Sequence, residues 1–375
     1  MKVANHSSHP ELLQSHFSTR KPDLSRRRFL LLAGVGLLAG CSPFSQSPPL
    51  PTATPRPRLQ RITAENASRL KQVHLLDLQA SVHGLAWSPD GHLLAVAPSN
   101  QIDLWAVETM NHLLTLKGHT ARINGLAWSP DNSLLASVST DGTTHVWNTK
   151  QWQSTATLKH TAQGGSFESI LSAAWSPDGH QLITGNADGT LELWEVKTSK
   201  NLGKWHGLKE ETPLSGSYPF GVWGVAWSPD GQRIASNRYD KYTFVWAAHT
   251  GKLVKTLIPS DQPNGAAYSP DGKLLAITND GGTVQLWSPT GKNMQVLSGH
   301  PEAGWAYPIV WSPDGNLLAT TRESGLLQLW EVKTGKELAA LQDHTGAAWT
   351  ATWSPDGKQL ATGGDDTSVH LWAVL

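Results

Sequence analysis

The stretch Ala86-Trp87-Ser88-Pro89-Asp90-Gly91 decides the predicted fold, because its pattern recurs along most of the sequence. The aromatic-Ser-Pro-Asp core recurs with a tyrosine once in the aromatic position, at Trp128, Trp175, Trp227, Tyr268, Trp311 and Trp353. Successive copies lie 41, 47, 52, 41, 43 and 42 residues apart. A second landmark, a Trp after Leu or Val, follows each copy once, at Trp105, Trp147, Trp194, Trp246, Trp287, Trp330 and Trp372. One unit is therefore copied seven times.

Each unit contains four short runs of β-branched and aliphatic residues separated by turn residues. In the second unit these runs are 113–116, 123–128, 134–137 and 144–147, which is an all-β pattern. Ser-Pro-Asp-Gly is a hairpin turn whose fourth residue is predicted to have a positive φ, because that residue is Gly in six copies and Asn132 in the other. A repeat of this length with four strands predicts one blade of a β-propeller.

With both landmarks in step over seven copies, the chain from about residue 70 to residue 375 resembles the WD-repeat β-propeller family. The Trp-Asp pair that gives the family its name is absent here, since the closing Trp is followed by Ala, Asn, Glu or Ser. The resemblance implies an all-β, seven-bladed propeller with four-stranded antiparallel blades. No fourth strand follows Trp372, so we expect an N-terminal strand near residues 70–78 to complete the last blade and close the ring.

The resemblance also implies hydrogen-bonded tetrads of His, Ser or Thr, Asp and Trp inside the blades. Two units carry a complete set: His119, Ser137, Asp141 and Trp147, and His344, Thr362, Asp366 and Trp372. Two more units are partial, with Thr184, Asp188 and Trp194, and with Ser236, Asp240 and Trp246. In the first of these we expect a longer loop to displace His160, and in the second His206 lies far upstream. Apolar packing between blades should therefore provide most of the stability.

The first forty residues have the pattern of an export signal. Arg26 and Arg27 stand before Phe29 and Leu30, and a short apolar run continues to residue 40, too short to span a bilayer. The paired arginines resemble the twin-arginine signal of bacteria. Residues 1–40 are accordingly interpreted as the signal.

The only cysteine, Cys41, follows Leu-Ala-Gly in a stretch that resembles a bacterial lipobox. The resemblance implies cleavage before Cys41 and lipidation of its sulfur, unless a cysteine stands here by chance. Residues 41–60 then form a lipidated, Pro-rich linker and residues 61–375 the propeller. The expected product is an exported bacterial lipoprotein at the outer face of the cytoplasmic membrane. Acylation by two or more chains would hold it there stably.

Composition narrows the classes of function. Thirty Lys and Arg balance thirty Asp and Glu, so charge gives no support to a nucleic-acid partner. No phosphate-binding Gly loop, nucleophile-elbow Ser or zinc-type His spacing occurs. We therefore predict no enzyme activity, no cofactor and no metal. His83 at the channel mouth is a possible base or metal ligand, although a solvated or core histidine is the commoner case.

The residues that break the repeat indicate a candidate binding face. The position four residues before each landmark aromatic should begin the innermost strand, and it holds His83, Asn124, Leu171, Trp223, Asn264, Tyr307 and Trp349. We expect the face to consist of His83, Trp223, Tyr239, Trp305, Tyr307 and Trp349. Insertions at 163–168 and 208–220 should project beside it. The alternative is that these rings fill the channel as core.

Three functions fit this sequence. The first is a non-enzymatic scaffold that binds a protein or peptide partner while anchored to the membrane. The second is an extracytoplasmic sensor of a small ligand or carbohydrate, which would use the aromatic mouth. A propeller hydrolase is the third. The sequence leaves the oligomeric state open.

Overall fold

The computed structural model describes residues 58–160, 168–207, 221–299, 306–342 and 344–375. Over these ranges the chain forms twenty-eight strands and two short 3-10 helices, η1 (Ala67–Arg69) and η2 (Val196–Thr198). None of the helices within them has the length and apolar character needed to cross a lipid bilayer.

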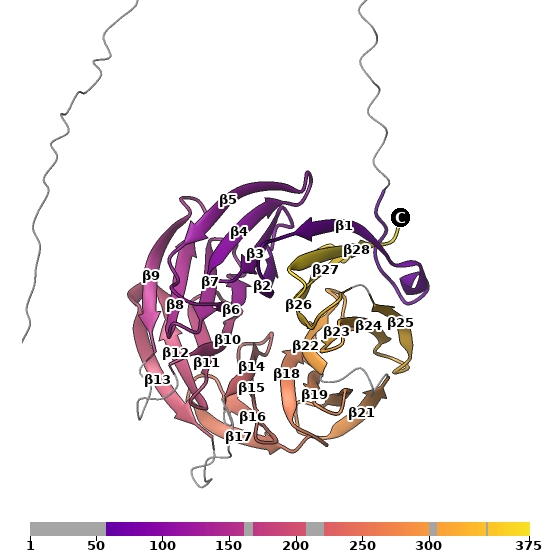
Figure 1. The fold of residues 1–375 in the computed structure, drawn as a ribbon. Coiled ribbons are helices and arrows are strands. Elements are labelled where there is room, and N and C mark those ends of the chain that lie inside the picture. The colour runs from indigo at the N-terminus through magenta and orange to yellow at the C-terminus, as the bar shows by residue number, and fades with distance from the viewer. Residues whose placement is uncertain (1–57, 161–167, 208–220, 300–305, 343) are drawn as a thin grey trace, which may run out of the picture. The chain divides into compact units, whose positions relative to one another are not determined.

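The strands form seven four-stranded antiparallel sheets, which are the blades of a ring (Figure 1). The predicted seven-bladed propeller is thereby confirmed. Counted along the chain and from the innermost strand outwards, blades 1 and 2 are β2 (Val82–Trp87), β3 (Leu93–Pro98), β4 (Gln101–Ala106) and β5 (Asn111–Lys117), then β6 (Ile123–Trp128), β7 (Leu134–Ser139), β8 (Thr143–Asn148) and β9 (Gln153–Lys159). Blades 3 and 4 are β10 (Ile170–Trp175), β11 (Gln181–Asn186), β12 (Thr190–Glu195) and β13 (Lys200–His206), then β14 (Val222–Trp227), β15 (Arg233–Arg238), β16 (Tyr242–Ala247) and β17 (Lys252–Leu257).

The remaining blades follow the same order. Blades 5 and 6 are β18 (Pro263–Tyr268), β19 (Leu275–Asn279), β20 (Thr283–Trp287) and β21 (Asn293–Ser298), then β22 (Ala306–Trp311), β23 (Leu317–Arg322), β24 (Leu326–Glu331) and β25 (Glu337–Gln342). Blade 7 is β26 (Ala348–Trp353), β27 (Gln359–Gly364), β28 (Ser368–Ala373) and, from the other end of the domain, β1 (Lys71–Asp77).

The Ser-Pro-Asp-Gly stretch forms the turn between the first and second strands of each blade. In blade 1 the Ser88 hydroxyl donates to Asp90, whose carboxylate also accepts from the backbone N–H of His92 at 3.0 Å. The fourth turn residue has the predicted positive φ, 77° at Gly91 and 63° at Asn132. The repeat therefore requires a residue that tolerates the left-handed region at this position.

These turns also touch one another around the ring. The proline of one turn lies against the glycine of the next blade's turn in six of the seven seams, including Pro355 against Gly91 where the ring closes. At the other seam the turn carries Asn132, and its side-chain amide donates to Asp90 Oδ2 of blade 1 at 2.6 Å. The single exception to Gly in the repeat thus forms a hydrogen bond between two blades.

The landmark Trp side chains join neighbouring blades. Trp175 Nε1 donates to the carbonyl of Ala127, which precedes the landmark Trp of blade 2, at 2.9 Å. Trp128, Trp311 and Trp353 make the equivalent bond to the blade before them. The indole of Trp227 has no acceptor among the described residues, and Tyr268 has no indole. Four seams therefore carry a hydrogen bond from the landmark.

Two N-terminal segments close the ring. β1 pairs antiparallel with β28, in a register from Lys71 opposite Ala373 to Asp77 opposite Ser368 (Figure 1). The predicted closing strand is confirmed. The segment before it is also packed, since the N–H of Gln60 bonds to the carbonyl of Val374 at 2.9 Å and Ile62 is buried against blades 6 and 7. The folded region therefore includes Gln60, which the sequence assigned to the linker.

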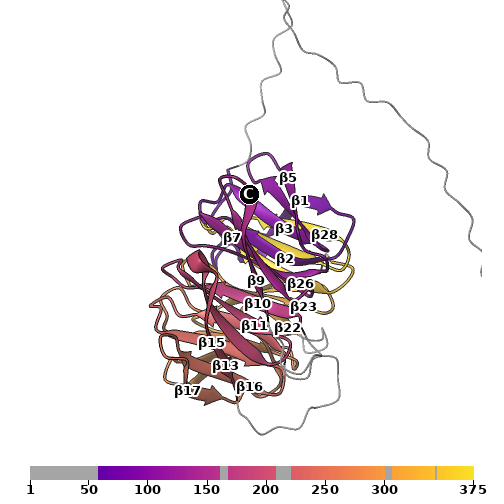
Figure 2. The ribbon, with the colours of Figure 1, turned by 90° about the vertical axis from the view of Figure 1, so that its left-hand side faces the viewer.

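The core is divided between the seams. Buried apolar residues of the described ranges form seven clusters, each shared by two neighbouring blades. Between blades 1 and 2, for example, Ile102 and Leu104 pack with Ile123 and Trp128. Seen from the side, the ring shows its blades stacked one behind another, which brings these faces together (Figure 2). Apolar surface buried at each seam stabilises the ring by about 25 cal/mol per Å².

Candidate functional site

The seven positions predicted to begin the innermost strands are β-bulges. In every blade the pairing of the first two strands shifts at this place, for instance between Val82 and Gly84 around His83. A bulge leaves a residue out of the ladder and redirects its side chain. In every blade the repeat therefore presents a variable residue outside the strand pairing at the start of the innermost strand, where a ligand-binding residue can change without loss of strand pairing.

His83 and Trp349, from neighbouring blades 1 and 7, form a contact at this mouth. Their ring centroids are 5.2 Å apart, and His83 Nε2 lies 3.9 Å from Asp365 Oδ1. Burial and the positive charge of Arg122 lower the pKa of His83 to about 4, although the Asp365 carboxylate acts in the opposite direction. His83 is therefore neutral at physiological pH, and its ring is available for stacking.

Blade 4 contributes Trp223 and Tyr239 to the predicted face. Trp223 is 39% exposed, which is unusual for so large an apolar side chain. Tyr239 is half-buried, and burial together with the charge of Asp280 raises the pKa of its phenol. Asp280 also accepts from the amide of Asn264 at 2.8 Å. This part of the mouth combines an exposed indole with a hydrogen-bonded polar group.

The other predicted residues of the face lie partly or wholly outside the described ranges. Tyr307 is at the bulge of β22, but its side chain is not described, and Trp305 lies in the undescribed segment 300–305. The insertion 208–220 and all but Glu168 of the insertion 163–168 are outside the described residues as well. Arg26, Arg27, Phe29, Leu30 and Cys41 also belong to the undescribed N-terminal region.

The structure joins each complete tetrad in one hydrogen-bonded chain. His119 Nδ1 donates to Asp141 at 2.9 Å, Ser137 Oγ lies 2.8 Å from His119 Nε2, and Trp147 Nε1 donates to Ser137 at 3.0 Å. The corresponding chain in blade 7 consists of His344, Asp366, Thr362 and Trp372. Although burial alone would raise the pKa of Asp141, hydrogen bonds from Thr143, the Thr120 N–H and His119 lower it to about 2. These four residues of each blade are engaged with one another and stabilise the blade.

The expectation that a longer loop displaces His160 is wrong. His160 is buried in blade 3, where its Nε2 lies 3.3 Å from Asp188 and its Nδ1 lies 2.9 Å from Glu192. Lys204 Nζ is 3.3 Å from the same Asp188. Although burial lowers the pKa of His160, the hydrogen bonds and charges of the two carboxylates raise it to about 9. The insertion follows His160 in the chain, so it leaves the histidine in place.

The fourth blade uses an arginine where the tetrad would have a histidine. Arg238 is buried and donates from Nε to Asp240 at 2.8 Å, while Trp246 Nε1 donates to Ser236 at 2.9 Å. The Asp thus keeps a charged partner although His206 does not reach it. Sequence reasoning missed Arg238 because it lies between the tetrad Ser and Asp in the chain.

Sequence reasoning also missed a second buried position, two residues before the closing Trp. It is polar in six of the seven blades, buried in five and half-buried at His145: Asp103, His145, Glu192, Gln285, Gln328 and His370. In blade 5, Gln285 Nε2 donates to Ser260 at 2.8 Å, and in blade 7, His370 Nδ1 lies 3.0 Å from Gln72 Oε1 of β1. Comparing the seven units at this position would have revealed it, since polar residues recur in a strand that is otherwise buried.

One of these residues completes a compact group of possible metal ligands. Ligand atoms of His344, Asp366 and His370 lie within 4.8 Å of one another. His344 is already bonded to Asp366 and Thr362, and His370 Nε2 lies 2.8 Å from the hydroxyl of Ser368. The hydrogen bonds explain the arrangement, and the group belongs to the blade 7 network.

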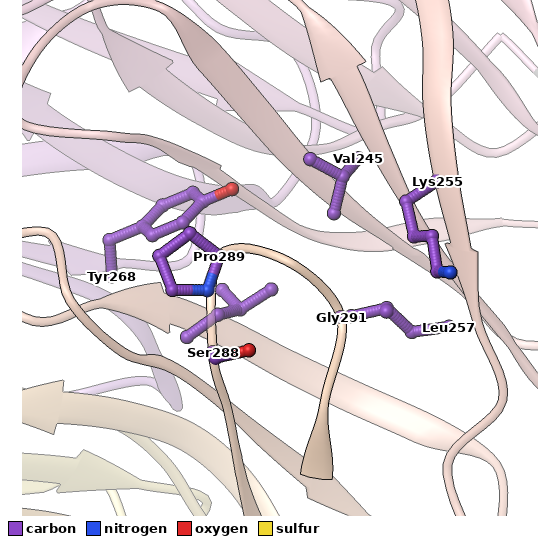
Figure 3. A pocket seen from close by; sticks show the side chains of 8 residues that line it. Val245, Lys255, Leu257, Tyr268, Ser288, Pro289 and Gly291 are labelled. Carbon is purple, nitrogen blue, oxygen red and sulfur yellow. The ribbon is translucent and has the colours of Figure 1, made fainter. Parts of the chain in front are cut away.

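A shallow hollow lies at the seam between blades 4 and 5, away from the mouth (Figure 3). Its lining includes Tyr268, Lys255, Leu257 and Pro289. This is the seam at which the landmark is Tyr, whose ring is smaller than the indole of the other blades. The hollow leaves no enclosed room for even one water molecule, so it is a surface depression.

Comparison with known protein families agrees with the geometry. Residues 110–148, 152–195, 209–247 and 335–373 match the family model described as WD domain, G-beta repeat. Residues 266–352 match the model described as anaphase-promoting complex subunit 4 WD40 domain. No curated protein gives a significant match. The repeated unit is thus the WD40 repeat, and the chain is a WD-repeat β-propeller protein.

Proposed function

We propose that this protein is a non-enzymatic scaffold whose channel mouth binds a protein or peptide partner. WD40 propellers generally act as non-catalytic interaction scaffolds. The observation that carries the proposal is the exposed indole of Trp223 on a bulge at the mouth, in a face that also holds the adjacent rings of His83 and Trp349. Trp and Tyr are enriched among the residues that contribute most to binding at protein interfaces.

Alanine substitution of the two tryptophans tests the mouth. Trp223→Ala and Trp349→Ala should each weaken partner binding at least about tenfold, because a central aromatic anchor contributes about 2 kcal/mol or more. The melting temperature of Trp223→Ala should change little, since its side chain is partly exposed. Binding is measured with partners captured by the wild type from a membrane extract, and Leu113→Ala on the outer wall is the control. A large loss of melting temperature with unchanged binding would contradict the proposal.

We further propose that the protein is exported through its twin-arginine-type signal and anchored by lipid on Cys41. The order of an Arg pair, a short apolar run, Leu-Ala-Gly-Cys and a Pro-rich stretch supports this. In the native bacterium, Cys41→Ser should move the protein from the membrane fraction to the soluble fraction. Ser42→Ala, which keeps the thiol, is the matched control. Retention of Cys41→Ser in membranes at the wild-type level would refute lipid anchoring.

A sensor of a small ligand or carbohydrate is the second candidate. The contact between the His83 and Trp349 rings favours it, because adjacent planar rings are a platform for a sugar face or an apolar ligand. Screening a carbohydrate set by tryptophan fluorescence distinguishes the two functions. A saturable change that disappears in Trp349→Ala would favour the sensor.

A further inference from the structure

The outer wall of blades 4 and 5 carries an unusual number of exposed apolar side chains. Ten large apolar residues are exposed within the described ranges, and five of them lie on β17, on β21 or directly after β17: Leu253, Val254, Ile258, Met294 and Val296. β17 and β21 are the outermost strands of neighbouring blades (Figure 1). Exposed apolar residues gathered in this way are typical of an interaction surface.

The same wall is basic, although the whole chain carries balanced charge. Residues 241–260 and 281–299 contain no Asp or Glu. Lys252, Lys255 and Lys292 are exposed on or beside the two strands, and none of them forms an ion pair with a described residue. The wall is defined here as these three lysines together with the five apolar residues, and it is called the blade 4–5 wall.

Other blades do not combine these two properties. The hairpins between the third and fourth strands of blades 1, 3 and 6 contain acidic residues, among them Glu108, Glu195 and Glu331. The hairpin β8–β9 of blade 2 has no acidic residue, but it holds none of the exposed large apolar side chains. The combination is therefore a feature of this one sector and not of the repeat.

The shape of the wall suits a broad partner. It holds the hollow between Lys255, Leu257 and the turn at Ser288 and Gly291, which is shallow (Figure 3). Lysine is depleted in protein–protein interfaces, where aromatic residues and Arg are enriched. Aliphatic side chains with interspersed lysines are the composition of surfaces that lie on anionic lipid.

We propose that the blade 4–5 wall docks on an anionic lipid surface. The aliphatic side chains enter the boundary between headgroups and acyl chains, and the lysine ammonium groups contact the lipid phosphates. The proposal is independent of the mouth and of the lipid on Cys41, and it adds an orientation: the propeller lies with this sector against the membrane.

The single cysteine makes a position-specific test possible. The full chain with Cys41→Ser has no thiol, so Val254→Cys or Leu113→Cys introduces one site for an environment-sensitive fluorophore. Val254 and Leu113 are both 53% exposed, and they lie on β17 and β5, on opposite sides of the ring (Figures 1 and 2). Each labelled protein is mixed with vesicles of phosphatidylcholine alone or with added phosphatidylglycerol.

The fluorophore at position 254 should shift to shorter wavelength with the anionic vesicles only, and the fluorophore at 113 should not respond. Changing Lys252, Lys255 and Lys292 together to Gln should weaken binding about a hundredfold, about fivefold for each lysine. High salt should act in the same direction. Equal responses at 254 and 113 would show attachment through the N-terminal apolar segment and overturn the proposal. The absence of an emission shift at position 254 with anionic vesicles would also overturn it. So would an emission shift that grows with protein concentration when no vesicles are present.

Discussion

Trp105 and Trp147 occupy the same position in neighbouring blades, but only Trp147 has an acceptor for its indole N–H. In blade 2 that acceptor is the hydroxyl of Ser137, whereas Val96 stands at the equivalent place in blade 1 and Trp105 Nε1 is buried without a described partner. Blade 5 repeats this, with Ile277 in the place of the hydroxyl and Trp287 Nε1 unpaired among the described residues. A single hydroxyl therefore decides whether the closing Trp of a blade is hydrogen-bonded.

Ser137→Ala should destabilise the protein by about 2 kcal/mol or more, because it leaves both Trp147 Nε1 and His119 Nε2 buried without a partner. Val96→Thr is the matched control, since it keeps the shape and supplies a hydroxyl to Trp105. We expect it to change the free energy of unfolding by less than about 1 kcal/mol. Urea unfolding measures both. Equal losses in the two variants would show that the hydroxyl contributes nothing.

The raised pKa of His160 predicts a pH dependence of stability. The pKa is about 9 in the folded protein and near 6.5 in the unfolded chain, so the folded state binds the proton more tightly. The stabilisation is complete below about pH 6.5 and is lost as the pH rises through 9. His160→Gln should flatten the pH dependence of the urea midpoint over this range, whereas His249→Gln, at an exposed histidine, should leave that dependence unchanged. An unchanged slope in His160→Gln would contradict the prediction.

At the scale of elements, the landmark Trp connects one blade to the next. Trp175→Phe removes the hydrogen bond to the Ala127 carbonyl, whereas Trp227→Phe removes an indole that has no described acceptor. Both substitutions delete a similar amount of ring surface. Trp175→Phe should therefore be the more destabilising by about 1 kcal/mol in chemical denaturation. If Trp227→Phe cost as much, the bonds at the seams would not matter to stability.

The innermost strands share another feature at this scale. All of them carry a bulge at the position that varies most between units, where the chain has His83, Trp223 and Trp349 among others. Pairing on both sides of the bulge keeps the strand in place whichever side chain stands there. The repeat thereby separates residues that hold the blade from residues that can bind a partner.

At the scale of the whole molecule, β1 determines whether the ring is closed. Leu76 points into the cluster between blades 7 and 1, while its neighbour Leu75 is exposed. Leu76→Ala should cost about 2–4 kcal/mol and should increase self-association, because a loosened β1 uncovers the edge of β28. Leu75→Ala should leave the free energy of unfolding and the self-association unchanged. Denaturant unfolding and light scattering measure the two effects, and similar behaviour of both variants would disprove the role of β1 packing.

Much of this architecture could be predicted because it repeats. Two landmarks in step over seven units indicated the blades, the positive φ of the turn residue and the closing strand. Besides the polar position before the closing Trp, the features that escaped prediction include the place of His160, the arginine at Asp240 and the packing of Gln60 against Val374. Each of them depends on a contact that occurs in one blade only, so the repeated pattern does not indicate it.

The sequence by itself determined the number of blades, the turns and the strand that closes the ring, because these follow from local patterns copied at a regular interval. Only the tertiary structure decided which polar side chains pair inside each blade and that the variable mouth residues stand on bulges. It also placed the exposed apolar residues of β17 and β21 on the outermost strands of neighbouring blades. The physical reason is that these features arise where separate strands come together, and the repeated local pattern does not specify which side chains meet there.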